Sequence, residues 1–185
     1  MEKNNNYIFY SELALPYLES NEKVIEKIFK NLQNKFNLVS NSNQRFIDLG
    51  AGDGTVIIHS ALRYNIESVG IEIKPSLINE CNNRIDLLKE NSNELQSRLQ
   101  KVKMIQGDLF QQTLESFDFV YIFSLPTMQR FLNHVFRTAR KGAIFISYKY
   151  PLEDFPYLNQ KDKMEIKIKD KNVCVYFYNK QSTNS

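Results

Sequence analysis

Apolar residues recur along the chain at two spacings, and the change between them predicts alternating helices and strands. Within residues 20–36, Val24, Ile28 and Leu32 recur every fourth residue, which predicts a helix with one apolar face and Ser20 as its N-cap. Short apolar runs bounded by turn residues predict buried strands. The pattern predicts helices over 20–36, 55–64 and 126–139 and from Pro75 onward, and strands over 45–49, 67–73, 102–106, 117–123 and 143–148.

The C-terminal part of the chain departs from this alternation. Two strand patterns, 164–169 and 173–178, are separated only by residues 170–172, which predicts a β-hairpin. Strands that alternate with helices imply right-handed crossovers and a parallel sheet. The sequence therefore predicts an α/β fold, an open sandwich with a mostly parallel sheet of about seven strands that ends in an antiparallel C-terminal hairpin.

Composition narrows the class of protein. The 185 residues are 42% hydrophobic and 24% charged, which fits one globular domain. We expect residues 1–185 to form that domain, with an N-terminal lid segment over 1–19, a first helix over 20–37 and a ligand-binding core over 45–179. The net charge of +3 does not demand a nucleic-acid partner, and no apolar run approaches the roughly 18 residues of a membrane helix.

Cysteine and histidine are scarce. Two residues of each predict neither a disulfide framework nor a metal site. The polar N-terminus lacks the pattern of a secretory signal. A reducing, cytoplasmic location is therefore expected, and the oligomeric state is left open.

The strongest local signal is the segment DLGAGDGT at residues 48–55, between a predicted strand and a predicted helix. Glycines at alternate positions let the backbone turn sharply and approach a ligand without Cβ atoms in the way. In an open parallel sheet, ligands bind at the carboxyl ends of the strands. A tight turn without a ligand is the alternative. The predicted ligand-binding positions of this loop are Asp48, Gly50, Ala51, Gly52 and Gly54.

The glycine spacing separates two classes of ligand. A dinucleotide loop has the pattern G-x-G-x-x-G, so that a helix N-terminus meets a pyrophosphate. This loop is G-x-G-x-G, and Asp48 and Asp53 bracket it. Two carboxylates repel a pyrophosphate and attract a cation. S-adenosylmethionine (SAM), which carries a sulfonium and an ammonium but no phosphate, therefore suits the loop better.

Acids also close the next two predicted strands. Glu72 at the end of the second strand is placed to accept hydrogen bonds from ribose hydroxyls. Asp108 after the third strand is placed to accept from an adenine amine, with Leu109 or Ile73 covering the ring. Each acid alone is also compatible with a solvated strand end or a plain turn. Three consecutive strand ends that carry a glycine loop, an acid and an acid form a more specific pattern.

These motifs resemble the SAM-binding motifs of the class I, seven-β-strand methyltransferases. The resemblance rests on residues 48–55, Glu72 and Asp108 and on the closing hairpin, and it covers about residues 15–179. It implies a Rossmann-like methyltransferase sandwich with SAM as cofactor and S-adenosylhomocysteine as product.

A narrower resemblance is to a lysine methyltransferase family that includes the ATP synthase c-subunit lysine methyltransferase and an archaeal protein-lysine methyltransferase. It is carried by residues 16–20 with 24–28, by IFSLPTM at 122–128 and by YKYPL at 148–152. Family members often have Arg at the position of Lys149 and an aromatic residue at the position of Leu152. These departures leave the identity of the substrate open.

The family resemblance implies methyl transfer to the ε-amine of a lysine in a protein substrate. By analogy, Tyr17 would meet the methionine end of SAM, and Ser124 and Pro126 would hold the acceptor, so these three are the candidate catalytic residues. A neutral amine favours an apolar, aromatic channel, with Phe123 and Tyr148 as further candidate walls. Packing of Tyr17 and a plain turn at Ser124 are the structural alternatives.

Two other functions stay open from the sequence. One is methylation of RNA or a small molecule, and the other is a SAM-binding module without catalysis. Enzymes that methylate base amines often have two prolines and then an aromatic residue after the fourth strand, where the aromatic stacks the flipped base. Here Thr127 follows the single Pro126, which argues against a nucleic-acid substrate.

Overall fold

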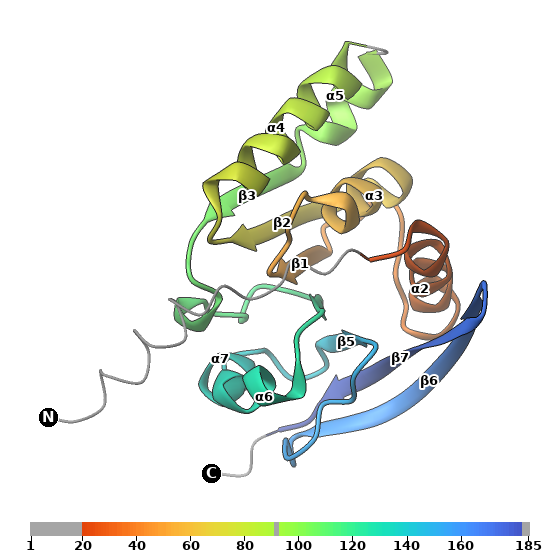
Figure 1. The fold of residues 1–185 in the computed structure, drawn as a ribbon, viewed down its shortest axis with the longest axis vertical. Helices are drawn as coiled ribbons and strands as arrows, with labels where there is room; N and C mark the ends of the chain where they lie inside the picture. The colour runs from red at the N-terminus through yellow and green to blue at the C-terminus, as the bar shows by residue number, and fades with distance from the viewer. Residues whose placement is uncertain (1–19, 91–92, 183–185) are drawn as a thin grey trace, which may run out of the picture.

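The computed structural model describes residues 20–90 and 93–182 (Figure 1). The expected lid segment over 1–19, with Tyr17, lies outside these residues. The helices are α2 (Glu22–Lys35), α3 (Thr55–Tyr64), α4 (Pro75–Lys89), α5 (Asn93–Leu99), α6 (Pro126–Gln129) and α7 (Asn133–Arg137), with short 3₁₀ turns η1 (Leu109–Gln111) and η2 (Arg130–Leu132). The strands are β1 (Arg45–Leu49), β2 (Glu67–Glu72), β3 (Val102–Gln106), β4 (Phe119–Ile122), β5 (Ile144–Tyr148), β6 (Leu158–Ile168) and β7 (Lys171–Lys180).

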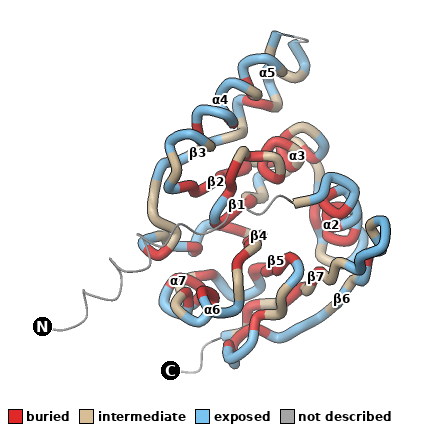
Figure 2. The backbone as a smooth tube through the Cα atoms, in the orientation of Figure 1, coloured by how far each residue is buried: buried red, intermediate tan, exposed pale blue. Residues whose placement is uncertain are grey.

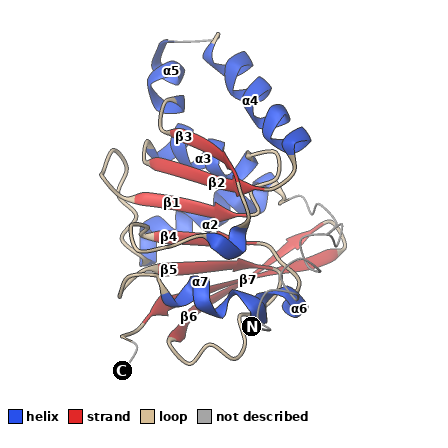
Figure 3. Cartoon of the chain, turned by 90° about the vertical axis from the view of Figure 1, so that its left-hand side faces the viewer, coloured by secondary structure: helices blue, strands red, loops and turns tan. Residues whose placement is uncertain are grey.

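These strands form one seven-stranded sheet in the order β3-β2-β1-β4-β5-β7-β6 (Figure 3). The first five strands in this order are parallel, and β7 pairs antiparallel with both β5 and β6. The predicted α/β fold with a closing hairpin is therefore confirmed. The strand order reverses between β1 and β4, so the carboxyl ends of these two strands diverge into loops on opposite sides of the sheet and leave room for a ligand.

Helices cover both faces of the sheet (Figures 2 and 3). Apolar residues of α2, α3 and α4 pack on one face, and those of α6 and α7 pack on the other. Strands buried on both faces have nearly continuous apolar sequences, and for this reason the sequence pattern predicts β1, β4 and β5. No helix among the described residues is both long and apolar enough to cross a membrane.

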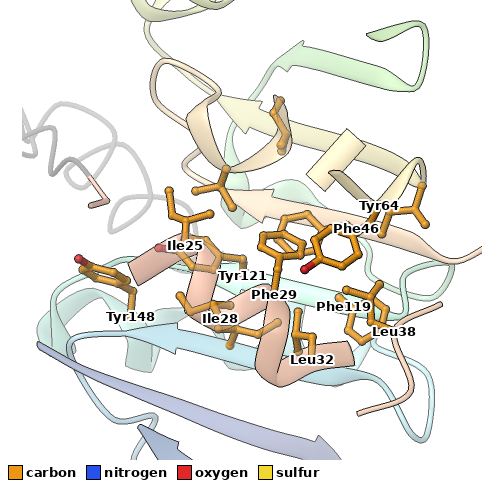
Figure 4. Close-up of a cluster of buried hydrophobic side chains, with 14 of the residues drawn as sticks. Ile25, Ile28, Phe29, Leu32, Leu38, Phe46, Tyr64, Phe119, Tyr121 and Tyr148 are labelled. Carbon is orange, nitrogen blue, oxygen red and sulfur yellow. The ribbon is translucent and has the colours of Figure 1, made fainter. Parts of the chain in front are cut away.

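Helix α2 anchors one face of the sheet. Its residues Ile25, Phe29 and Leu32 are buried, and Figure 4 shows them beside Phe46 and Tyr121 of the strands. The predicted N-cap was wrong by one residue.

The cap is Asn21, whose Oδ1 accepts from Lys23 N. The hydroxyl of Ser20 is instead 2.7 Å from the hydroxyl of Tyr121 in β4, so Ser20 contacts the sheet and does not cap the helix.

Three elements differ from the predicted pattern. The helix expected over 126–139 is divided by η2, because α and 3₁₀ turns have similar periods that an apolar pattern does not separate. Helix α5 has one buried residue, Leu99, too few to create a pattern. The hairpin begins at Leu158, well before the predicted start, because β6 is an edge strand whose polar residues face solvent while its backbone pairs with β7.

Candidate active site

The glycine loop joins the end of β1 to the start of α3. Gly50, Gly52 and Gly54 have φ angles of +89°, +56° and +76°, which favour glycine over residues with a Cβ atom. A Cβ on Gly54 would lie 2.2 Å from Cys81 Sγ, whereas a Cβ on Gly50 would meet only Leu109, at 3.9 Å. Gly54 therefore serves packing against α4, and Gly50 leaves space beside the loop.

The carboxyl group of Glu72 holds this loop against the end of β2. Its Oε2 accepts from Gly52 N at 2.9 Å, and its Oε1 accepts from the backbone N–H groups of Ile73 and Lys74, both at 2.9 Å. Only 8% of Glu72 is exposed. Such multiple bonds from backbone donors are strong, so Glu72 organises the glycine loop.

Asp48 is the most deeply buried acid of the site, with 3% of its surface exposed. It lies in β1 between Gly70 of β2 and Tyr121 of β4. Within the described part of the chain, no donor bonds to its carboxyl group. Burial raises the pKa of Asp48 well above its usual value, and the charges of Glu72 and Asp53 raise it further. A buried carboxyl group without a partner creates a preference for a cation beside it.

Asp53 has a different role. Its carboxylate accepts from the backbone N–H of Thr55 at 3.0 Å and from the Thr55 hydroxyl at 2.8 Å. Arg84 of α4 lies 3.4 Å from Asp53 Oδ2 and donates to Thr55 Oγ1 at 2.6 Å. Of the two acids that bracket the loop, Asp53 is therefore already paired with an arginine distant in sequence, whereas Asp48 has no donor among the described residues.

The three remaining cofactor candidates follow the ends of β2 and β3. Asp108 Oδ1 accepts from Phe110 N at 2.9 Å and so caps η1, and its other oxygen accepts no hydrogen bond from the described residues. Leu109 reaches over Gly50, and Ile73 is 47% exposed. Apolar side chains thus flank the space between the ends of β2 and β3, as a ligand with a flat ring requires.

Aromatic rings form the other half of the site, at the ends of β4 and β5. Phe123 packs against Tyr148 with ring centroids 4.6 Å apart, and Tyr150 lies 6.5 Å from Phe123. The hydroxyl of Tyr148 accepts from Asn21 N at 3.3 Å. Burial raises the pKa values of Tyr121 and Tyr148, so both hydroxyls stay protonated at neutral pH.

Ser124 and Pro126 follow directly after this aromatic half. Ser124 is 8% exposed, and its buried Oγ has no hydrogen-bond partner within residues 20–90 and 93–182. Pro126 is exposed and opens α6 at its first turn. An unpaired buried hydroxyl costs about 1–3 kcal/mol, so the Ser124 hydroxyl is available to a ligand that enters the candidate site.

One small pocket brings both halves together. It is lined by Ser20, Asp48, Gly50, Ala51, Asp53, Thr55, Val56, Tyr121 and Phe123. The other predicted residues that the structure describes do not line it: Gly52, Gly54, Glu72, Ile73, Asp108, Leu109, Ser124 and Pro126. Ser20 and Tyr121 were missed by sequence reasoning, because only the register of β4 on β1 places Tyr121 opposite Asp48.

SAM fits these residues. The unpartnered Asp48 suits a cationic group, the open face of Gly50 admits a ligand to the backbone, and the aromatic rings suit a sulfonium. No group of three or more His, Cys, Asp or Glu within residues 20–90 and 93–182 is arranged to hold a metal ion.

Comparison with known proteins agrees with this geometry. Residues 48–159 match the family model of the ANTKMT methyltransferase domain. A protein-lysine N-methyltransferase of Saccharolobus islandicus is 25% identical over 168 residues, which cover 89% of this chain and 92% of that protein.

Solved structures share the fold. An RNA methyltransferase from Salinibacter ruber in complex with S-adenosyl-L-homocysteine has a TM-score of 0.70 at 19% identity, covering 91% of this chain and 97% of that one. Magnesium protoporphyrin IX methyltransferase from Synechocystis PCC 6803 has a TM-score of 0.65 at 12% identity, covering 96% and 95%. Because the family model spans more than half of the chain, the protein belongs to the ANTKMT methyltransferase domain family and is a class I methyltransferase that uses SAM as its methyl donor.

Proposed function

We propose that this protein is a protein-lysine N-methyltransferase that transfers the methyl group of SAM to a lysine ε-amine. The family and the archaeal protein-lysine methyltransferase relative support this substrate class. The observation that carries the proposal is the aromatic half of the site, where Phe123, Tyr148 and Tyr150 cluster beside the backbone of Ser124. This surface suits a long alkyl chain that ends in an amine.

The cofactor half would hold SAM through groups that are already in place. We assign the ammonium of its methionine moiety to Asp48, the ribose hydroxyls to Glu72 and the adenine amine to Asp108. Leu109 and Ile73 would cover the adenine ring. When bound, SAM supplies an activated methyl group on a sulfonium.

The aromatic half would make the lysine nucleophilic. A free lysine has a pKa near 10.4, so at pH 7 fewer than about one in a thousand is neutral, and deprotonation costs about 4.6 kcal/mol. Desolvation against the packed rings of Phe123 and Tyr148, with the exposed Pro126 following in the same segment, would lower the pKa of a bound lysine, and a nearby sulfonium would lower it further. Alignment of the amine with the methyl group then accelerates the reaction through proximity and orientation.

Ser124 would orient the neutral amine through its carbonyl and its unpaired hydroxyl. The nitrogen lone pair then forms the N–C bond while the S–C bond breaks and its electron pair stays on sulfur. The extra proton on nitrogen leaves to water. Tyr121 and Tyr148 do not serve as the base, because their raised pKa values keep them protonated.

The proposal is tested by incubating the protein with methyl-labelled SAM and an extract of the source organism. We expect label in the protein fraction, and mass spectrometry should locate it on lysine. The matched control is the Asp48→Asn variant, which should label the same band more slowly at limiting SAM. Label found only in RNA or in small molecules would overturn the lysine assignment, and SAM binding without any labelled product would indicate a module without catalysis.

A further inference from the structure

A buried glutamine supports the backbone at the acceptor side of the site. Gln129, the last residue of α6, is 3% exposed although its side chain is a polar amide. Its Nε2 donates to the carbonyl oxygen of Ser124 at 3.2 Å, and its backbone N donates to the carbonyl oxygen of Leu125 at 3.2 Å. One residue therefore holds two successive carbonyls of the segment between β4 and α6.

The Ser124 carbonyl would otherwise be an unused acceptor. Pro126 has no N–H to offer, and Met128 N donates to Leu125 and not to Ser124. Among the described residues, the Gln129 amide is the one donor to this oxygen. A carbonyl oxygen has two lone pairs, so this bond leaves one acceptor position at the end of β4.

We propose that Gln129 is a positioning residue for methyl transfer, which fixes the Ser124 carbonyl so that its second lone pair accepts an N–H of the acceptor amine. This inference rests on the proposed transfer to an amine. A neutral primary amine has two N–H donors and one lone pair. If the Ser124 carbonyl and the Ser124 hydroxyl each accept one N–H, the nitrogen lone pair is left to face the methyl group.

The amide orientation follows from the contact itself. If the two ends of the Gln129 amide were exchanged, its oxygen would face the Ser124 carbonyl oxygen, and two acceptors do not bond. Removal of this donor leaves the backbone bond from Gln129 N to Leu125 intact, so α6 keeps its first turn. A loss of alignment is therefore expected without a loss of fold, and small misalignments of reacting groups reduce rates by about 100-fold in other enzymes.

Gln129→Met is the central variant, because methionine has a similar length and no donor. The assay measures initial rates of label transfer from SAM into a fixed amount of extract, with SAM varied. We expect the maximal rate to fall about 10- to 100-fold while the apparent KM for SAM and the SAM dissociation constant stay within about twofold. The matched control is Gln44→Met, since Gln44 Nε2 also donates to a backbone carbonyl, that of Asn37, at 2.9 Å. Gln44 directly precedes β1, at the amino ends of the parallel strands and away from the site. This variant should keep the wild-type rate.

Gln129→Glu adds a measurement, the pH dependence of the transfer rate, that should not change if Gln129 only supported the fold. A protonated glutamic acid can donate to the Ser124 carbonyl, whereas the ionised form repels it. Burial raises the pKa of such a carboxyl group. The ratio of variant to wild-type rate should therefore fall as the pH rises, at constant SAM binding. If Gln129→Met does not fold, this ratio decides the question alone.

The inference is overturned if Gln129→Met transfers methyl at the wild-type rate, if its SAM affinity falls in parallel with its rate, or if the Gln129→Glu ratio does not change with pH. The proposed function is judged separately, from the fraction that the wild-type protein labels. Label only in RNA refutes lysine transfer, and the variants are then scored on that RNA, so the role of Gln129 is decided in either case.

Discussion

The two halves of the site treat their polar groups in opposite ways. In the cofactor half, the Glu72 carboxyl group accepts three backbone N–H bonds and Asp53 is paired with Thr55 and Arg84. In the proposed acceptor half, the Ser124 hydroxyl is buried without a partner among the described residues. The cofactor half is thus held in shape by its own bonds, whereas the acceptor half keeps a polar group unpaired for a molecule that arrives.

This difference predicts which substitutions should change stability together with activity and which should change activity without destabilising the fold. A side chain with several internal bonds stabilises the fold, so its removal affects both folding and binding. A buried polar group without internal bonds does not stabilise the fold, so its removal should reduce binding or chemistry without destabilising the protein. Asp48 is intermediate, because it lies in the cofactor half yet has no donor among the described residues. Four substitutions test this separation.

The largest effect is expected from Gly54→Ala. The left-handed φ of +76° and a Cβ only 2.2 Å from Cys81 Sγ should together lower the free energy of unfolding by about 2–5 kcal/mol. Chemical denaturation measures this. Gly142→Ala is the matched control, because Gly142 has a φ of +87° with no atom near its Cβ position, so only about 1–2 kcal/mol should be lost. Equal losses at both positions would show that contact with α4 does not constrain the loop.

Glu72→Ala should weaken SAM binding by about 1–3 kcal/mol and also destabilise the fold, because three backbone N–H groups lose their acceptor. Calorimetry and thermal unfolding measure the two effects. Glu67→Ala, at the other end of β2, removes a carboxylate paired with Arg45 and Lys103 and should leave SAM affinity unchanged. Undiminished SAM affinity in Glu72→Ala would mean that Glu72 neither binds the cofactor nor shapes the loop.

Asp48→Asn should weaken SAM binding by about 1–2 kcal/mol yet raise the Tm by about 2–4 °C at neutral pH. The raised pKa of Asp48 means that the protonated form is favoured in the fold, so the wild-type protein loses stability as the pH rises through that pKa, and the variant does not. SAM binds the ionised form better, so wild-type affinity should fall as the pH falls.

Calorimetry and thermal unfolding over a pH series measure both slopes. A lower Tm in Asp48→Asn would contradict the reading of Asp48 as an uncompensated buried acid. If SAM affinity had the same pH dependence in both proteins, Asp48 would not be part of the binding site.

Ser124→Ala should destabilise the fold least. The hydroxyl has no partner among the described residues, so its removal should leave the free energy of unfolding unchanged or raise it by up to about 1–3 kcal/mol, and SAM affinity should be retained. Methyl transfer should fall about tenfold, because one acceptor for the amine is lost. Ser147→Ala is a control from β5, since the Ser147 hydroxyl donates to Tyr150 O at 2.6 Å, and it should reduce stability more than Ser124→Ala does. A normal transfer rate in Ser124→Ala would remove the hydroxyl from the proposed mechanism.

The sequence alone determined the class of fold and the cofactor edge. Apolar runs mark β1, β4 and β5 because strands buried on both faces carry few polar residues, and glycines at alternate positions mark the sharp turn after β1. The acids Asp48, Glu72 and Asp108 could be found because each lies at or just after the end of a strand that is itself recognisable. These features are local, so a one-dimensional pattern records them.

Only the tertiary structure decided which groups are free and which are already paired. Arg84 neutralises Asp53 from a helix distant in sequence, the register of β4 on β1 sets Tyr121 opposite Asp48, and Gln129 reaches back to Ser124. Each of these contacts depends on how separate elements are packed against one another. Charge, burial and hydrogen bonding are properties of that packing, and for this reason they were not legible from residue types and spacings.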